Sequence, residues 1–107
     1  MTTPPLGKGR RMNYDEILCH HIDRAAARLD VLVPKWAQRI DLERLDLNDS
    51  QDCILGQVFG YRWRRWFYTY ARAKRHMPYV RDGAFIGGRS SPQHSRWRAH
   101  VMQRCAA

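Results

Sequence analysis

Apolar residues recur along residues 14–32 at the spacing of one face of an α-helix. They lie four, three, four and three residues apart, which places them on a single stripe of a helix surface. The stripe consists of Leu18, Ile22, Ala25, Leu29 and Leu32. Asn13 suits the N-cap position, and Asp15 and Glu16 suit the positive end of a helix dipole. The pattern therefore predicts an amphipathic helix over residues 14–32 that packs inside the molecule.

Shorter elements are expected after this helix. Trp36 and Ile40 lie four residues apart, which predicts a short helix over residues 34–40, because Pro34 is tolerated in a first turn. Apolar residues in 40–47 fit a strand only if a bulge is allowed, and we expect irregular or 3₁₀ structure there.

A further short helix is expected over residues 50–59. Asn48 or Asp49 would cap it, and Gly60 is a natural residue just beyond its C-terminus. Its buried residues would be Cys53, Ile54 and Val58.

Residues 61–75 combine arginines with aromatic residues in an ordered way. At about 100° per residue, one narrow arc of a helix would hold Trp63, Trp66, Phe67 and Tyr70. The opposite side would hold Arg64, Arg65, Arg72 and Arg75, joined by Tyr61 and Tyr68. This predicts a helix with an aromatic core face and an arginine face, ended by Pro78.

A last helix is expected over residues 92–104. Ser91 suits its N-cap, and Pro92 suits its first position. Turns precede it at Asp82–Gly83 and Gly87–Gly88, around the apolar residues 84–86. The helix would direct Trp97 and Val101 inward and Arg96, Arg98 and Arg104 outward.

These elements predict an all-α fold, a compact bundle of four or five short helices. It would form one domain over residues 13–107, after a flexible basic arm over residues 1–12. The arm contains two prolines, two glycines and three basic residues. The expected core consists of Leu18, Ile22, Leu29, Trp36, Ile40, Ile54, Val58, Trp63, Trp66, Phe67, Tyr70, Trp97 and Val101.

Charge changes this picture because it is unevenly distributed. Residues 1–53 carry eight Lys or Arg and nine Asp or Glu, whereas residues 54–107 carry eleven basic residues and one acid, Asp82. Sixteen of the 19 basic residues are arginine, whose planar fork suits phosphates and carboxylates. The second half therefore indicates an anionic partner: nucleic acid, an acidic protein face or an anionic lipid surface.

Two strings of residues resemble a known group. The strings Trp36-x3-Ile40-Asp41-x3-Leu45 and Cys53-Ile54-Leu55-Gly56-Gln57-Val58-Phe59-Gly60-Tyr61 resemble a pattern of small uncharacterised proteins of actinobacteria and their phages. The resemblance implies a cytoplasmic protein of phage or actinobacterial origin, and it implies no activity.

The arginine face is the candidate functional surface. Arginine neutralises phosphates and tyrosine stacks on exposed bases, a combination typical of proteins that track the nucleic-acid backbone. The residues assigned to this surface are Arg62, Arg64, Arg65, Tyr68, Arg72, Lys74 and Arg75. A helix-turn-helix over residues 50–75 also fits the order of elements, although a recognition helix normally presents mixed polar residues.

Other interpretations of the same surface stay open. A phage-type interaction module would dock it on an acidic host protein, which it would inhibit or redirect. A minor structural component would use it in assembly, and a basic face solvated by water needs no ligand.

Catalytic and metal-binding patterns are sparse. No glycine-rich phosphate loop, His-Glu-x-x-His or Gly-x-Ser-x-Gly motif occurs, so we predict a non-enzymatic protein without a cofactor. The acids at positions 41, 43, 46, 49 and 52 lack the spacing of a calcium loop and are interpreted as a solvated edge. Consecutive residues in Cys19-His20-His21 would point in different directions on a helix, so we predict no metal site. The three cysteines, Cys19, Cys53 and Cys105, fit reduced thiols.

Membrane insertion and export are not expected. No stretch reaches the ~18 apolar residues that a spanning helix requires. Residues 1–12 lack the apolar region of a secretory signal. We therefore expect a cytoplasmic location, in the host cytoplasm for a phage-encoded protein, and no membrane partner.

Overall fold

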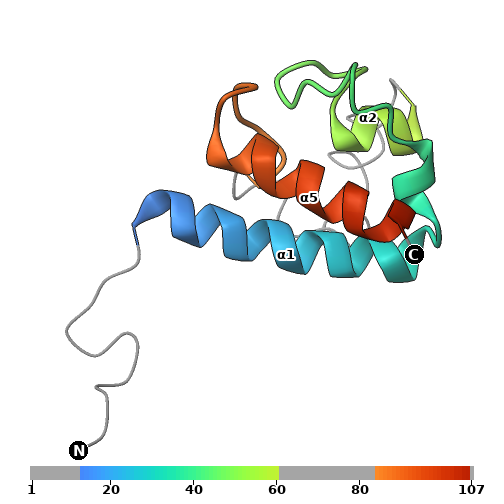
Figure 1. Ribbon diagram of the computed structural model, residues 1–107, viewed down its shortest axis with the longest axis horizontal. Helices are drawn as coiled ribbons and strands as arrows, with labels where there is room; N and C mark the ends of the chain where they lie inside the picture. Colours follow the sequence, from blue (N-terminus) through green and yellow to red (C-terminus); the bar gives the residue numbers. More distant parts are fainter. Residues whose placement is uncertain (1–12, 61–83, 107) are drawn as a thin grey trace, which may run out of the picture.

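The computed structural model describes residues 13–60 and 84–106, and these residues form a compact helical structure (Figure 1). They contain three α-helices, one 3₁₀ helix and no strand. The elements are α1 (Tyr14–Leu32), the 3₁₀ helix η1 (Trp36–Arg39), α2 (Ile54–Phe59) and α5 (Pro92–Ala106). The all-α class is therefore confirmed for the described residues, with three α-helices where four or five were expected. The expected arm over 1–12 and the expected helix over 61–75 lie outside the described residues.

Helix α1 begins where the sequence predicts. The Asn13 side chain accepts a hydrogen bond of 2.8 Å from the Glu16 backbone N–H, and its own amide donates to the Glu16 carboxylate. This satisfies one of the backbone donors that the first turn of a helix leaves unpaired. At the other end, the Val33 N–H bonds to Leu29 O.

Helix α5 packs along α1 and runs in the same direction (Figure 1). Ser91 is its N-cap, because its hydroxyl accepts from the His94 N–H at 3.1 Å. Pro92 occupies the first helical position, where a missing N–H costs nothing. The helix continues to Ala106, slightly beyond the expected end.

Helix α2 starts later than expected. It begins at Ile54, and its N-cap is Cys53, whose Sγ accepts from the Gly56 N–H at 3.2 Å. The expectation that Asn48 or Asp49 caps a helix from residue 50 is wrong. The Asp49 carboxylate accepts from the N–H groups of Gln51 and Asp52, which closes a local turn instead.

Two glycines fit the ends of α2. A Cβ on Gly56 would overlap the backbone oxygens of Ser50 and Gln51, so only glycine allows this turn to lie against the helix. Gly60 ends the helix with φ of 89°, a conformation that glycine adopts without strain.

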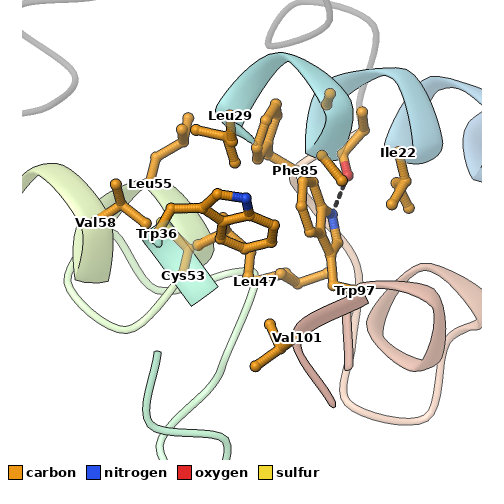
Figure 2. Close-up of a cluster of buried hydrophobic side chains, with 14 of the residues drawn as sticks. Ile22, Leu29, Trp36, Leu47, Cys53, Leu55, Val58, Phe85, Trp97 and Val101 are labelled. Carbon is orange, nitrogen blue, oxygen red and sulfur yellow. Dashed lines mark hydrogen bonds between the residues drawn. The ribbon is translucent and has the colours of Figure 1, made fainter. Parts of the chain in front are cut away.

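The core forms around two tryptophans, Trp36 of η1 and Trp97 of α5 (Figure 2). Their rings meet edge to face with centroids 5.8 Å apart, and Phe85 lies 4.9 Å from Trp97. The Trp97 indole N–H donates to Ala84 O at 2.7 Å, so the buried polar atoms of both groups are satisfied.

Most of the expected core is confirmed. The expected core residues that are buried are Leu18, Ile22, Leu29, Trp36, Ile54, Val58, Trp97 and Val101. Ile40 is only partly buried. Trp63, Trp66, Phe67 and Tyr70 lie outside the described residues. The core also contains residues that the sequence pattern did not assign to it, among them Leu45, Leu47, Leu55, Ala84 and Phe85.

The cap of α2 yields a stability prediction. We expect Cys53→Ala to lower the free energy of unfolding by about 1 kcal/mol, because alanine cannot accept the Gly56 N–H. Cys53→Ser should fold with a higher free energy of unfolding than Cys53→Ala, because serine is a good N-cap. Urea denaturation of both variants and the parent checks this, and equal stability of the two variants would contradict the cap.

Candidate functional site

The surface predicted from the sequence lies outside the described residues. This applies to all of its members, Arg62, Arg64, Arg65, Tyr68, Arg72, Lys74 and Arg75. Of the helix-turn-helix interpretation, only α2 falls in the described part.

Residues 61–83 lie between two described ranges, 13–60 and 84–106, which together we call the scaffold. The residues next to 61–83 on both sides are part of this folded scaffold. Gly60 closes α2 through a hydrogen bond from its N–H to Gly56 O at 2.8 Å. At the other side Ala84 and Phe85 are buried against Trp97. The Gly87 N–H donates to the Asn48 side chain at 3.2 Å, and this bond joins the loop before α5 to the turns before α2. Residues 61–83, which we call the basic segment, are therefore flanked on both sides by residues that contact the rest of the scaffold.

A polar seam joins α1 to α5 in the described residues. Arg96 donates through Nε to Asp23 Oδ1 at 2.7 Å and through Nη2 to Asp23 Oδ2. Arg104 donates to the Asp30 carboxylate through Nε and Nη2, both at 2.8 Å. Each pair is bidentate, the geometry in which an arginine–carboxylate pair is strongest. We call these residues, with His100, the α1–α5 seam.

His100 lies between the two ion pairs. Its Nε2 is 2.6 Å from Asp23 Oδ1, and its Nδ1 is 2.9 Å from Arg104 Nη1. A guanidinium has only donors, so Nδ1 must accept from Arg104. The ring is therefore neutral in this arrangement, and the proton on Nε2 is donated to Asp23. With both nitrogens used inside the protein, His100 has no free nitrogen for a substrate or a metal ion.

The seam corrects one expectation and reveals residues that the sequence pattern missed. Arg96 and Arg104 were expected to point to solvent, but both reach across to α1. The signal was present in the spacing, because Asp23 and Asp30 are seven residues apart and the two arginines eight. Such spacings repeat along one side of a helix. Only Arg98, of the three arginines expected outside, lies exposed and without a partner in the described part of the chain.

The two aspartates have lowered pKa values. The hydrogen bonds from Arg96, and then from His100, lower the pKa of Asp23 to about 2, against the opposing effect of burial. The hydrogen bond from Arg104, helped by the Trp36 indole, lowers the pKa of Asp30. Both carboxylates are therefore ionised near neutral pH.

The lowered pKa of Asp23 predicts acid sensitivity. Its contribution to stability is complete above pH 4 or so and is lost as the pH falls toward about 2. Because a third of the side chain is exposed, we expect a loss of about 1 kcal/mol rather than the full linkage value. The Asp23→Asn variant should be less stable than the parent at pH 5, and this difference in unfolding free energy should become smaller as the pH falls to 2. A constant difference between pH 5 and pH 2 in urea titrations would contradict it.

An open depression of about 280 Å³ lies on the seam. Asp23, Arg96, Ala99, His100 and Gln103 line it. Both Asp23 oxygens and both His100 nitrogens already have partners in the protein, so the depression offers no free base or nucleophile. Among the described residues, no three His, Cys, Asp or Glu side chains converge as a metal site.

The acids of residues 41–52 are used in local structure. The carboxylates of Asp41, Asp46 and Asp49 accept backbone N–H groups two or three residues further along. Arg44 pairs with Asp52 at 2.8 Å. These acids shape the turns before α2, which explains why they occur so close together.

The three cysteines are free thiols, and two of them make hydrogen bonds. Cys53 caps α2, and the Cys105 thiol donates to Ala37 O at 3.6 Å. Burial raises the pKa of the Cys19 thiol, which disfavours its reactive thiolate form.

The described residues carry no excess charge. Residues 13–60 and 84–106 contain nine Lys or Arg and nine Asp or Glu. Residues 1–12 and 61–83 contain the other ten basic residues and one acid, which equals the net charge of +9 of the whole chain. The scaffold is balanced, and two segments account for the basic character of the protein.

Comparison of the chain with protein-family models, with curated proteins and with solved structures finds no match. None of the helices in the described ranges has the length and apolar character needed to span a membrane.

Proposed function

We propose that this protein is a small basic binding protein, without enzymatic activity, that binds nucleic acid through residues 61–75. The proposed contacts are Arg62, Arg64, Arg65, Tyr68, Arg72, Lys74 and Arg75. The helical scaffold would present this segment to the phosphate backbone.

The charge distribution carries the proposal. Across residues 13–60 and 84–106 the nine basic residues are matched by nine acids, and two of the arginines on α5 are held in bidentate pairs with α1. The excess of positive charge falls in residues 1–12 and 61–83. A general bias toward arginine would have charged the scaffold as well, so this distribution supports a dedicated anion-binding segment.

The composition of residues 61–75 favours nucleic acid over an acidic protein. This stretch of 15 residues contains six basic residues and six aromatic residues. Arginine neutralises phosphates on any sequence, and aromatic rings stack on any base. An acidic protein face would use the arginines, but it would give the interleaved tyrosines no particular role. A phage-type module that binds an acidic host protein is therefore the second candidate.

Binding of the full chain to labelled oligonucleotides tests the proposal. We expect fluorescence anisotropy to detect single-stranded RNA, single-stranded DNA and duplex DNA at a Kd of about 10⁻⁴ to 10⁻⁶ M or tighter near physiological salt. Unlabelled DNA of unrelated sequence should compete, and polyglutamate of equal charge should compete more weakly. Absence of binding to all three nucleic acids would contradict the proposal, and stronger competition by polyglutamate would favour an acidic protein partner.

A further inference from the structure

His100 connects the two ion pairs of the α1–α5 seam through both of its ring nitrogens. As a neutral ring it donates to Asp23 from Nε2 and accepts from Arg104 at Nδ1. Only 16% of its side chain is exposed. A proton that adds to this ring must bind at Nδ1, because Nε2 already carries one.

Protonation at Nδ1 is incompatible with the Arg104 contact. It would place an N–H donor opposite the guanidinium, which has only donors, and two positive charges would lie at 2.9 Å between heavy atoms. By contrast, the contact with Asp23 would become stronger, because a charged donor would face a carboxylate. The two contacts of His100 therefore respond to a proton in opposite ways.

We propose that His100 is a proton-operated switch in the α1–α5 seam. When neutral, the ring bridges the two ion pairs. When it takes a proton from solvent at Nδ1, it stays bound to Asp23 and loses its ring contact with Arg104 Nη1, which keeps its bond to the His100 backbone O at 3.1 Å.

The surrounding charges keep the change local. On α1 the ring faces the carboxylates of Asp23 and Asp30, and on α5 it faces Arg104 and shares Asp23 with Arg96. After the ring contact is lost, Arg104 is still held by Asp30 through Nε and Nη2 and by the His100 backbone O through Nη1. Repulsion from the protonated ring is thus expected to displace the guanidinium locally within these contacts while the helices stay together.

The core is next to this switch. The Arg104 guanidinium lies 5.4 Å from the centroid of the Trp36 ring, and the Trp36 indole N–H donates to the same Asp30 carboxylate at 2.8 Å. Arg39, on the same 3₁₀ helix as Trp36, donates to Val58 O of α2. A displacement of the Arg104 guanidinium therefore changes the environment of a buried tryptophan that contacts Trp97, and protonation of His100 is in this way linked to packing at η1.

Nuclear magnetic resonance of the parent protein tests the switch without any substitution. At about pH 8 we expect the ring ¹⁵N shifts of His100 to show Nε2 protonated and Nδ1 unprotonated. When acidification adds a second proton to the ring, the ring ¹⁵N shifts should place that proton on Nδ1, and the Trp36 indole and Arg104 side-chain signals should shift in step with it. A proton on Nδ1 at the higher pH, or Trp36 and Arg104 signals that stay constant while His100 titrates, would overturn the proposal.

Two substitutions assign the effect to His100. His100→Gln should abolish the pH response of the Trp36 signal, because glutamine offers a donor and an acceptor but does not titrate in this range. His20→Gln removes an exposed histidine of α1 and should leave the response unchanged. A Trp36 response that persists in His100→Gln, or that disappears in His20→Gln, would also contradict the switch.

Discussion

Trp97→Ala is expected to lower the free energy of unfolding by about 3–5 kcal/mol, the usual cost of removing a buried tryptophan. The indole is fully buried between Trp36 and Phe85. Its loss would leave a cavity and would also leave Ala84 O without its donor. A loss of this size approaches the whole stability of a small domain, so the variant should be partly unfolded at room temperature.

Two further variants serve as comparisons for the stability loss of Trp97→Ala. Trp97→Phe keeps much of the ring but removes the hydrogen bond to Ala84 O, so it should cost less than Trp97→Ala. Arg98→Ala changes the adjacent, exposed residue and should shift the unfolding free energy by no more than about 0.5 kcal/mol. Urea denaturation of the three variants gives the comparison, and a Trp97→Ala protein as stable as Arg98→Ala would refute the assigned core.

Reversing four arginines of the basic segment is expected to abolish nucleic-acid binding. The substitutions are Arg64→Glu, Arg65→Glu, Arg72→Glu and Arg75→Glu. If these residues contact phosphates, their reversal removes four charge contacts and adds repulsion, so affinity should fall at least 10³-fold or so near physiological salt. The melting temperature should stay close to that of the parent, because the expected arginine face is solvated.

A matched control separates this surface from net charge alone. Arg24, Lys35, Arg89 and Arg98 are exposed, and no ion pair joins them to another described residue. Reversing all four to glutamate changes the net charge of the protein by the same amount. We expect the control to weaken binding far less than the first variant. An equal loss in both would show that net charge, and not residues 61–75, governs binding.

The helices that the sequence predicted well are those with both a hydrophobic stripe and a clear cap. Asn13 with the stripe from Leu18 to Leu29 defined α1, and Ser91–Pro92 with Trp97 and Val101 defined α5. In these cases local hydrogen bonding and burial favour the same boundaries, so the pattern alone is sufficient.

The start of α2 was predicted wrongly because two kinds of local structure use the same residue types. Aspartate accepts backbone N–H groups both at helix N-caps and in turns. The Asp49 carboxylate accepts N–H groups in a turn, and Cys53 is the N-cap of α2. Because sulfur is a weak acceptor, residue preferences do not favour cysteine at an N-cap. Nothing in the spacing of residues 48–53 distinguishes these two arrangements.

The α1–α5 seam was missed for a different reason. Its partners are separated by 73 to 77 residues along the chain, so their pairing depends on which helices become neighbours. A charged residue on a helix surface looks the same in the sequence whether water or another helix faces it. The matched spacings on α1 and α5 acquire meaning only once the two helices are known to run side by side.

The dependence of nucleic-acid affinity on salt tests the central claim most directly. We expect the logarithm of the association constant to fall linearly with the logarithm of salt concentration, with a slope set by the number of phosphates neutralised. Arg64→Gln should make that slope shallower by roughly 0.7–0.9, the value for one phosphate contact, whereas Arg98→Gln should leave it unchanged. If both substitutions leave the slope equal to that of the parent, the proposed arginines do not contact phosphates and the account is contradicted.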